Sequence, residues 1–306
     1  MRNIIIILTL LVISSALIAC SNTTKSSGKN KDLDEKEIKY KLIKGEDVNY
    51  YVMPSDPIMG SASTIIEKNG KGLLIDTQFS NKDGKNIVKL AKEKSIDIEK
   101  IYISYSDPDF YFGTDIIKQN YPKAEVVATN ETIKRIKNTH NKKIEIWKET
   151  LKKDTPSKII IPKLISGNIN FEEEKFDIIG SNSKKQTLYN KKDNLLVGGI
   201  LTSTGSHLFM ADTKDISSQK EWINNLNELE RINPDVVIPG HFNKKDQFNK
   251  ESIKFTKQYI EDFIDAENTS DTSKEIIKKM KDKYPELSEG SIKMSAKVVT
   301  GEQKWE

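Results

Sequence analysis

The sequence predicts a mixed α/β fold (α+β) of four layers, in which two β-sheets pack face to face between outer helices (αββα). The chain has 306 residues, of which 36% are apolar, so it can bury a full α/β core. Short apolar strands alternate with amphipathic helices along most of its length. Each half places strands before helices, which is the order that a two-sheet sandwich with outer helices requires.

The first half supplies the strands of one sheet. They are expected at 39–43, 48–53, 63–67, 72–76, 101–104 and 125–128. Asn69-Gly70 should join the third strand to the fourth as a hairpin, because Asn-Gly favours the two-residue turn of antiparallel strands. Helices are expected at 83–94, 115–120 and 131–138. Thr129 or Asn130 should cap the last helix, and His140 should lie in an exposed polar loop after it.

The second half repeats the pattern and completes a domain spanning 39–268. Its strands are expected at 158–161, 175–179, 187–190, 195–198 and 236–238, with helices at 218–231 and 250–266. Residues 269–306 form a helical C-terminal extension with helices at 273–283 and 289–298. Tyr284-Pro285 should stop the first of these helices. We expect the extension to pack on the domain.

The amino terminus predicts export and lipid anchoring. Arg2 precedes an apolar run from Ile4 to Leu17, so residues 1–19 are typical of a secretory signal peptide. The run ends in Leu17-Ile18-Ala19-Cys20, which resembles a bacterial lipobox, and Cys20 is the only cysteine. Two acyl chains on Cys20 would hold the protein at the extracytoplasmic face of the cell membrane, on a polar tether of residues 20–38. The alternative is a buried structural cysteine.

Charge argues against a nucleic-acid partner. The formal net charge of +4 comes from 49 basic and 45 acidic residues spread along the chain. A nucleic-acid-binding protein concentrates arginine and aromatic residues on one face, and no such block is present in the sequence. This composition indicates a solvated, slightly basic surface.

Two motifs carry a family resemblance. After the strand at 101–104, Tyr105-Ser106-Asp107-Pro108-Asp109-Phe110-Tyr111-Phe112-Gly113 resembles the His-x-His-x-Asp-His-x-Gly motif of the metallo-β-lactamase superfamily. Val236-Val237-Ile238-Pro239-Gly240-His241 is similar to its terminal Pro-Gly-His segment, and the hairpin ending in Asp76 to its opening strands. The resemblance runs from Asn49 to the C-terminus and implies the four-layer αββα sandwich of the metallo-β-lactamase type.

The resemblance also implies which positions should face one cleft. Asp109 and His241 match metal-ligand positions of the family by identity. Asp107 stands at a histidine position of the family and could still act as a ligand by substitution. The remaining ligand positions are occupied by residues that offer little or nothing to zinc: Tyr105, Phe110, Ser183 and Gly199. His207 is expected to line the cleft, unless it is a surface-loop histidine without a role. The aromatic side chains Tyr105 and Phe110 either form a ligand pocket or fill the space of the missing metals.

Zinc enzymes of this family activate water on metal ions held largely by imidazoles, and this sequence lacks most of those imidazoles. We therefore expect no cofactor. The predicted function is binding or scaffolding by a membrane-anchored lipoprotein with a degenerate zinc site, whose partner is a small molecule or a cell-envelope protein. The alternative is a hydrolase in which Asp107, Asp109 and His241 hold one divalent metal ion, with Asp109 as the catalytic residue.

Overall fold

The computed structural model describes residues 38–54, 59–165, 167–243 and 247–305. The expected signal peptide, Cys20 and the tether up to residue 37 lie outside these residues. Residues 38–306 form one compact unit. Within the described part of that unit, no helix is both long enough and apolar enough to cross a bilayer.

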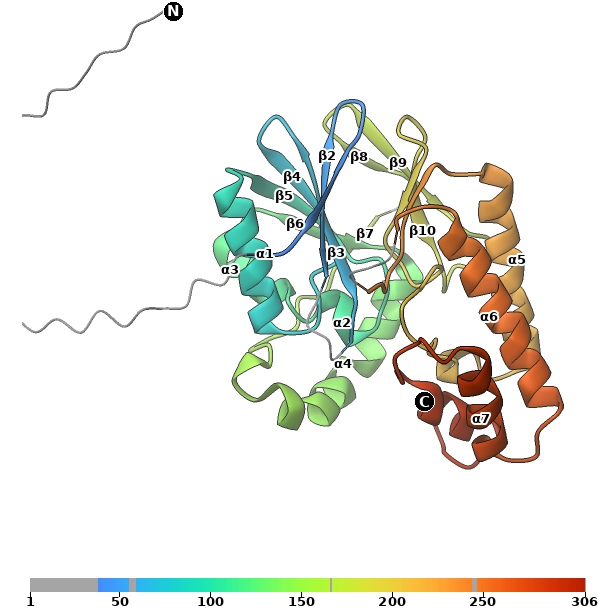
Figure 1. Cartoon of the computed structure of the whole chain (residues 1–306). Coiled ribbons are helices and arrows are strands. Elements are labelled where there is room, and N and C mark those ends of the chain that lie inside the picture. Colours follow the sequence, from blue (N-terminus) through green and yellow to red (C-terminus); the bar gives the residue numbers. More distant parts are fainter. Residues whose placement is uncertain (1–37, 55–58, 166, 244–246, 306) are drawn as a thin grey trace, which may run out of the picture. The chain divides into compact units, whose positions relative to one another are not determined.

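Two β-sheets face each other at the centre of the unit (Figure 1). The first sheet has seven strands in sequence order: β1 (Lys41–Lys44), β2 (Asn49–Pro54), β3 (Ala62–Lys68), β4 (Lys71–Ile75), β5 (Asp97–Tyr102), β6 (Glu125–Ala128) and β7 (Lys163–Leu164). The second has five strands in the order β12 (Val236–Ile238), β11 (Leu195–Val197), β10 (Thr187–Asn190), β9 (Glu174–Ile179) and β8 (Ile169–Phe171).

Helices cover the outer face of each sheet, on opposite sides in Figure 1. On the first sheet lie α1 (Asn81–Glu93), α3 (Thr114–Asn120) and α4 (Asn130–Leu151). On the second lie α5 (Ile216–Ile232) and α6 (Glu251–Asn268). Helix α7 (Ser273–Lys283) packs against α6 and against α8 (Ile292–Val299), and α7 and α8 both add apolar residues to the same cluster. Three apolar clusters fill the three interfaces between these layers. Neighbouring strand residues alternate between interfaces, as Ile65 and Ile66 do, because successive side chains point to opposite faces.

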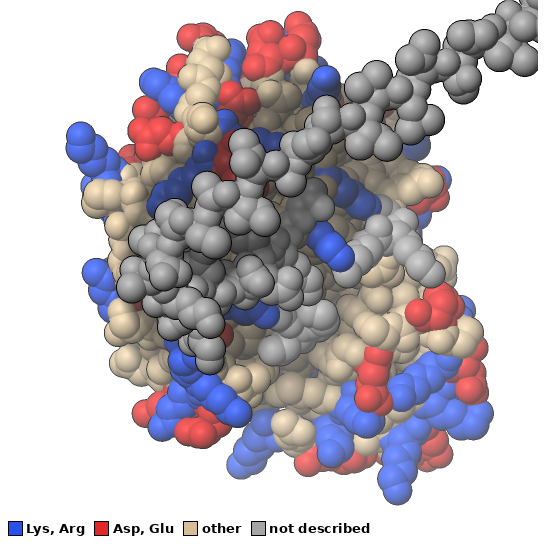
Figure 2. Space-filling model, turned by 60° about the vertical axis from the view of Figure 1, so that its left-hand side comes forward, with Lys and Arg blue, Asp and Glu red and all other residues tan. Residues whose placement is uncertain are grey.

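The predicted αββα sandwich is therefore confirmed. The predicted hairpin is also correct, since β3 and β4 pair antiparallel and both turn residues have positive φ, 55° at Asn69 and 78° at Gly70. Thr129, and not Asn130, is the N-cap of α4. On the face shown in Figure 2, Lys and Arg side chains lie beside Asp and Glu side chains.

Two predicted elements are wrong. Residues 158–161 form no strand; Ile159, Ile160 and Ile161 pack on the first core, and pairing begins only after Pro162, which has no backbone N–H to donate. Helix α4 continues far beyond residue 138, so His140 lies within the helix and not in a loop. The part of the helix after residue 138 contains two buried positions, Lys143 and Leu151, and the polar sequence around Lys143 concealed the first of them.

The ends of neighbouring strands bring the two family-like motifs together. β4 and β5 are parallel, as are β11 and β12, so the segments that follow β5 and β12 emerge at related edges of the two sheets. Short helix α2 (Pro108–Tyr111) follows β5, with Asp107 as its N-cap residue. Ser61 Oγ donates to the Asp109 carbonyl at 2.9 Å, and isolated bridges join His241 to Ser61 and Ser203.

Candidate functional site

Asp109 and His241 form the first pair of the site. His241 Nε2 lies 3.0 Å from Asp109 Oδ2, and the Asp109 side chain is only 2% exposed. The Phe110 ring packs edge-on against the imidazole, with ring centroids 5.6 Å apart. The two residues that match family ligand positions by identity are therefore bonded to each other.

Asp107 and Lys143 form the second pair. Lys143 Nζ, from α4, donates to Asp107 Oδ1 at 2.7 Å and to the Ser106 carbonyl at 3.3 Å. Burial raises the pKa of Asp107 to about 6, with a further contribution from the negative charge of Asp212, while Lys143 opposes the shift. An ammonium group of the protein thus holds the second carboxylate of the motif.

A third network lies behind these pairs. Arg135 donates to Asp212 Oδ2 at 2.8 Å and to the Tyr105 hydroxyl at 3.1 Å, and that hydroxyl donates to Asp212 Oδ2 at 3.1 Å. The indole N–H of Trp305 donates to Asp212 Oδ1 at 2.7 Å. Burial opposes ionisation of Asp212, but Arg135 and Trp305 together hold its pKa below the usual value. Both carboxylate oxygens of Asp212 are therefore occupied.

Lys185 is a buried cation beside the same network. Its Nζ has no hydrogen-bond partner among the described residues and lies 3.9 Å from the centroid of the Trp222 ring. Burial lowers the pKa of this lysine to about 8, although Asp212 and Asp107 oppose the shift. The aromatic face of Trp222 partly compensates for the lost hydration.

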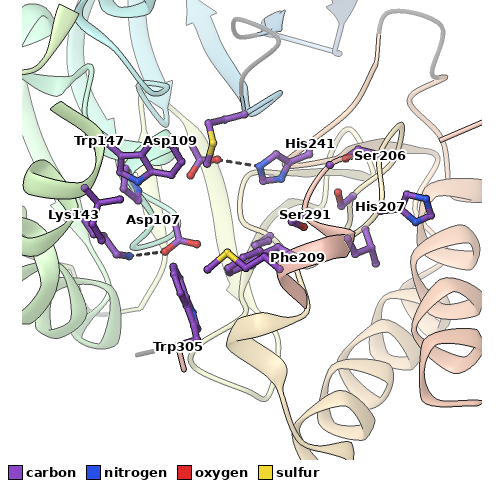
Figure 3. Close-up of a pocket in the computed structure, with 18 of the residues that line it drawn as sticks. Asp107, Asp109, Lys143, Trp147, Ser206, His207, Phe209, His241, Ser291 and Trp305 are labelled. Atoms are coloured by element: carbon purple, nitrogen blue, oxygen red, sulfur yellow. Dashed lines mark hydrogen bonds and ion pairs between the residues drawn. The ribbon is translucent and has the colours of Figure 1, made fainter. Parts of the chain in front are cut away.

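A cavity of about 470 Å³ opens beside the two pairs (Figure 3). Its polar lining comes from Asp107, Asp109, Lys143, Ser203, Ser206, His207, His241 and Ser291. Its apolar lining comes from Met59, Pro108, Ile146, Trp147, Ile200, Leu208, Phe209, Trp222, Met294 and Trp305. The arrangement is a largely apolar pocket with a small charged floor, which is how small-molecule sites are commonly built.

Four of the predicted site residues line this cavity: Asp107, Asp109, His207 and His241. Tyr105 and Phe110 are buried next to it, with their rings 5.5 Å apart, and support its floor without lining it. His207 is 2% exposed, and its Nδ1 lies 2.9 Å from the Tyr259 hydroxyl, so it is not a surface-loop histidine.

Two other expected cleft positions are wrong. Ser183 is exposed and does not line the cavity. Gly199 has φ of 78°, and a Cβ there would meet the Gln186 carbonyl oxygen at 2.0 Å. The close approach of Gln186, just before β10, therefore excludes any side chain at Gly199, including the aspartate that the family resemblance would place there.

The turn at Gly199 is instead held by Asp76. Asp76 Oδ1 accepts from the Ser104 N–H at 2.7 Å, and Ser104 Oγ donates to Asp76 Oδ2 and accepts from the Gly199 N–H at 2.7 Å. Burial raises the pKa of Asp76 to about 8. Asp76 thus connects the ends of β4, β5 and β11 beneath the site.

Most of the residues that line the pocket were not predicted from the sequence. Lys143 and Trp147 come from the overlooked part of α4, Phe209 from a loop, and Trp305 from the end of the chain. One signal was available: the chain has three tryptophans, and all three line this cavity.

The side chains of the site do not fit a zinc ion. Within residues 38–305, as far as the structure describes them, no three His, Cys, Asp or Glu side chains gather closely enough to hold a metal. Asp107 is paired with an ammonium group, and Asp109 with His241. Zinc requires about four donor groups, of which a catalytic site supplies three from the protein.

Comparison with solved structures identifies the fold. The chain is similar to the DIM-1 metallo-β-lactamase (17% identity, TM-score 0.50; 74% of this chain and 99% of that chain). It is similar to VMB-1 (17%, 0.51; 73% and 97%) and to a metallo-β-lactamase from Pontibacter korlensis (15%, 0.53; 73% and 99%). At these identities the likeness shows the fold alone. No protein-family model matches the chain, and no curated protein matches its sequence.

Proposed function

We propose that this chain, which has the metallo-β-lactamase fold, is a lipid-anchored protein that binds a small organic molecule in its pocket and does not hydrolyse it. One observation carries the proposal. Both carboxylates of the family-like motif are paired with side chains of the protein, while a cavity of about 470 Å³ remains beside them.

The pairing of Asp107 with Lys143 and of Asp109 with His241 opposes metal-dependent hydrolysis, but it leaves the cavity open to a ligand. Hydrolysis in this fold depends on metal ions that polarise a carbonyl and generate hydroxide. A divalent ion beside Asp107 would meet the ammonium group of Lys143, which already lies 2.7 Å from that carboxylate. The cavity volume is within the range of about 300–1,000 Å³ found for small-molecule sites. Of the two partners left open by the sequence, a cavity of this volume favours a small molecule over a cell-envelope protein.

The alternative, a hydrolase with one metal ion on Asp107, Asp109 and His241, has less support. It requires both pairs to separate, and separation would leave the buried Lys143 ammonium without its carboxylate. Removing one partner of a buried ion pair typically costs about 3–5 kcal/mol. Metal binding would have to supply that free energy before any catalysis began.

The proposal is tested by assaying the purified chain against a β-lactam, a thioester and a phosphodiester, with and without added zinc. We expect wild-type rates equal to those of Asp109→Ala, because no metal-bound water forms at the site. Chelator-sensitive turnover that Asp109→Ala abolishes would overturn the proposal in favour of the one-metal hydrolase.

Anchoring at the extracytoplasmic face of the membrane is part of the proposal and is supported by the sequence before and at Cys20. We expect wild-type protein in the membrane fraction with the mass of a diacylated cysteine, and Cys20→Ala without that added mass. Mature wild-type protein that carries no lipid at Cys20 would contradict this part.

A further inference from the structure

The walls of the pocket are aromatic, and they come from distant parts of the chain. Trp147 belongs to α4, Trp222 to α5, and Trp305 follows α8. The indole N–H of Trp222 donates to the Leu201 carbonyl at 2.9 Å, and that of Trp305 to Asp212. Since both polar edges are satisfied by the protein, these two rings offer a ligand their hydrocarbon surfaces.

The floor of the pocket offers acceptor oxygens. Asp107 uses Oδ1 for Lys143, and Asp109 uses Oδ2 for His241. The second oxygen of each carboxylate has no hydrogen bond from any described residue, although both side chains line the cavity. Figure 3 draws the Asp107 carboxylate beneath the Trp147 ring and above the Trp305 ring, and all three residues line the cavity. A ligand group that donates hydrogen bonds would complete these two acceptors.

The charged side chains that line the cavity favour a positive charge on the donor group of the ligand. Two carboxylates, Asp107 and Asp109, face the cavity together with one ammonium group, Lys143, and one imidazole, His241. A cationic donor is attracted both by carboxylate oxygens and by the faces of indole rings. An anion would approach two carboxylates with unsatisfied oxygens, and repulsion by like charges opposes its binding.

We propose that the pocket recognises an organic cation, an amine or guanidinium carried on an apolar body. The cationic head donates hydrogen bonds to the free oxygens of Asp107 and Asp109, and the body packs against Trp147, Phe209 and Trp305. The inference rests on the proposed function, since it names the ligand class for the same pocket.

Three probes with the same phenyl group and nine-carbon skeleton but different head-group charge test the inference on the purified whole chain: 3-phenylpropylamine, 3-phenylpropan-1-ol and 3-phenylpropanoate. Their affinities are measured by isothermal titration calorimetry, with quenching of tryptophan fluorescence as a second readout because all three tryptophans line the cavity. We expect the amine to bind about tenfold more tightly than the alcohol, because both head groups donate to the carboxylates but only the ammonium group adds attraction between opposite charges. The carboxylate should bind most weakly.

The isosteric variant Asp109→Asn should reduce amine affinity about tenfold and leave alcohol affinity unchanged. Asp97→Asn is the matched control, because Asp97 is exposed and begins β5, whereas the site follows the end of that strand. Circular dichroism shows whether each variant is folded. Equal affinities for the three probes, tightest binding of the carboxylate, or an unchanged amine preference in folded Asp109→Asn would overturn the inference, while probe binding itself would leave the proposed function standing. Absence of binding by all three probes would also overturn it, and the hydrolysis assay would then decide the proposed function separately.

Discussion

At the scale of single residues, the site differs from a metal centre in what each carboxylate contacts. Asp107 contacts an ammonium group, Asp109 an imidazole, and Asp212 a guanidinium and an indole N–H. Each of these carboxylates thus has a side-chain partner within the chain. A fourth buried aspartate, Asp76, is held by hydrogen bonds from Ser104 and has a raised pKa instead.

Gly199 gives a prediction about stability. Gly199→Ala should lower the free energy of unfolding by at least about 3 kcal/mol, because a Cβ would overlap the Gln186 carbonyl oxygen in addition to adopting positive φ. Gly167→Ala is the matched control: its φ of 79° is nearly the same, but a Cβ there meets nothing within 4 Å. The control should lose only about 1 kcal/mol. Equal losses in urea denaturation would show that Gly199 has room for a side chain.

The buried carboxyl group of Asp76 should make the stability of the protein depend on pH. Its pKa of about 8 lies above the unfolded value of 3.8, so the folded state binds a proton that the unfolded state releases. The resulting stabilisation is present below pH 4 and is lost as the pH rises towards 8. Between pH 6 and 8, the free energy of unfolding of the wild type should fall by ~1 kcal/mol per pH unit because of Asp76. In Asp76→Asn this contribution to the fall should be absent. Parallel stability–pH curves for wild type and Asp76→Asn would refute the assignment.

At the scale of elements, most strands and helix starts could be predicted from the sequence. The full length of α4, the helix that supplies Lys143 and Trp147 to the site, could not. β6, β10, β12 and α7 lie at the predicted residues, because their apolar periodicity reports burial directly. The sequence of the second half of α4 is mostly polar, yet this half supplies Lys143 and Trp147 to the site. A lysine that buries its stem and pairs its ammonium group leaves no hydrophobic pattern to detect.

The candidate site was predictable only where a motif marked it. Asp107, Asp109 and His241 follow strand ends that resemble a known family, so their convergence could be inferred. Phe209 and Trp305 reach the pocket through tertiary packing, which local sequence does not encode. Gly199 was misplaced for a related reason: the obstructing carbonyl belongs to Gln186, on a neighbouring strand connection.

At the scale of the whole molecule, the C-terminal extension contributes to the pocket. Ile276, Met280, Ile292 and Ala296 share the outer core of the second sheet with Trp222. The same segment brings Ser291, Met294 and Trp305 to the cavity. The Trp305 ring packs edge-on against the Phe209 ring, with ring centroids 5.5 Å apart. The pocket is thus assembled from both halves of the sandwich and from the extension.

The central claim is that Asp107 and Asp109 are each paired with a side chain of the protein, where a metal site would need free ligands. Its most direct test is a calorimetric titration of zinc into chelator-treated, dialysed protein, because the measurement asks whether Asp107, Asp109 and His241 are available to an ion. We expect no one-to-one zinc isotherm for wild type, and curves for Asp109→Ala and His241→Ala that match it. A one-to-one isotherm in wild type that disappears in both variants would contradict the account.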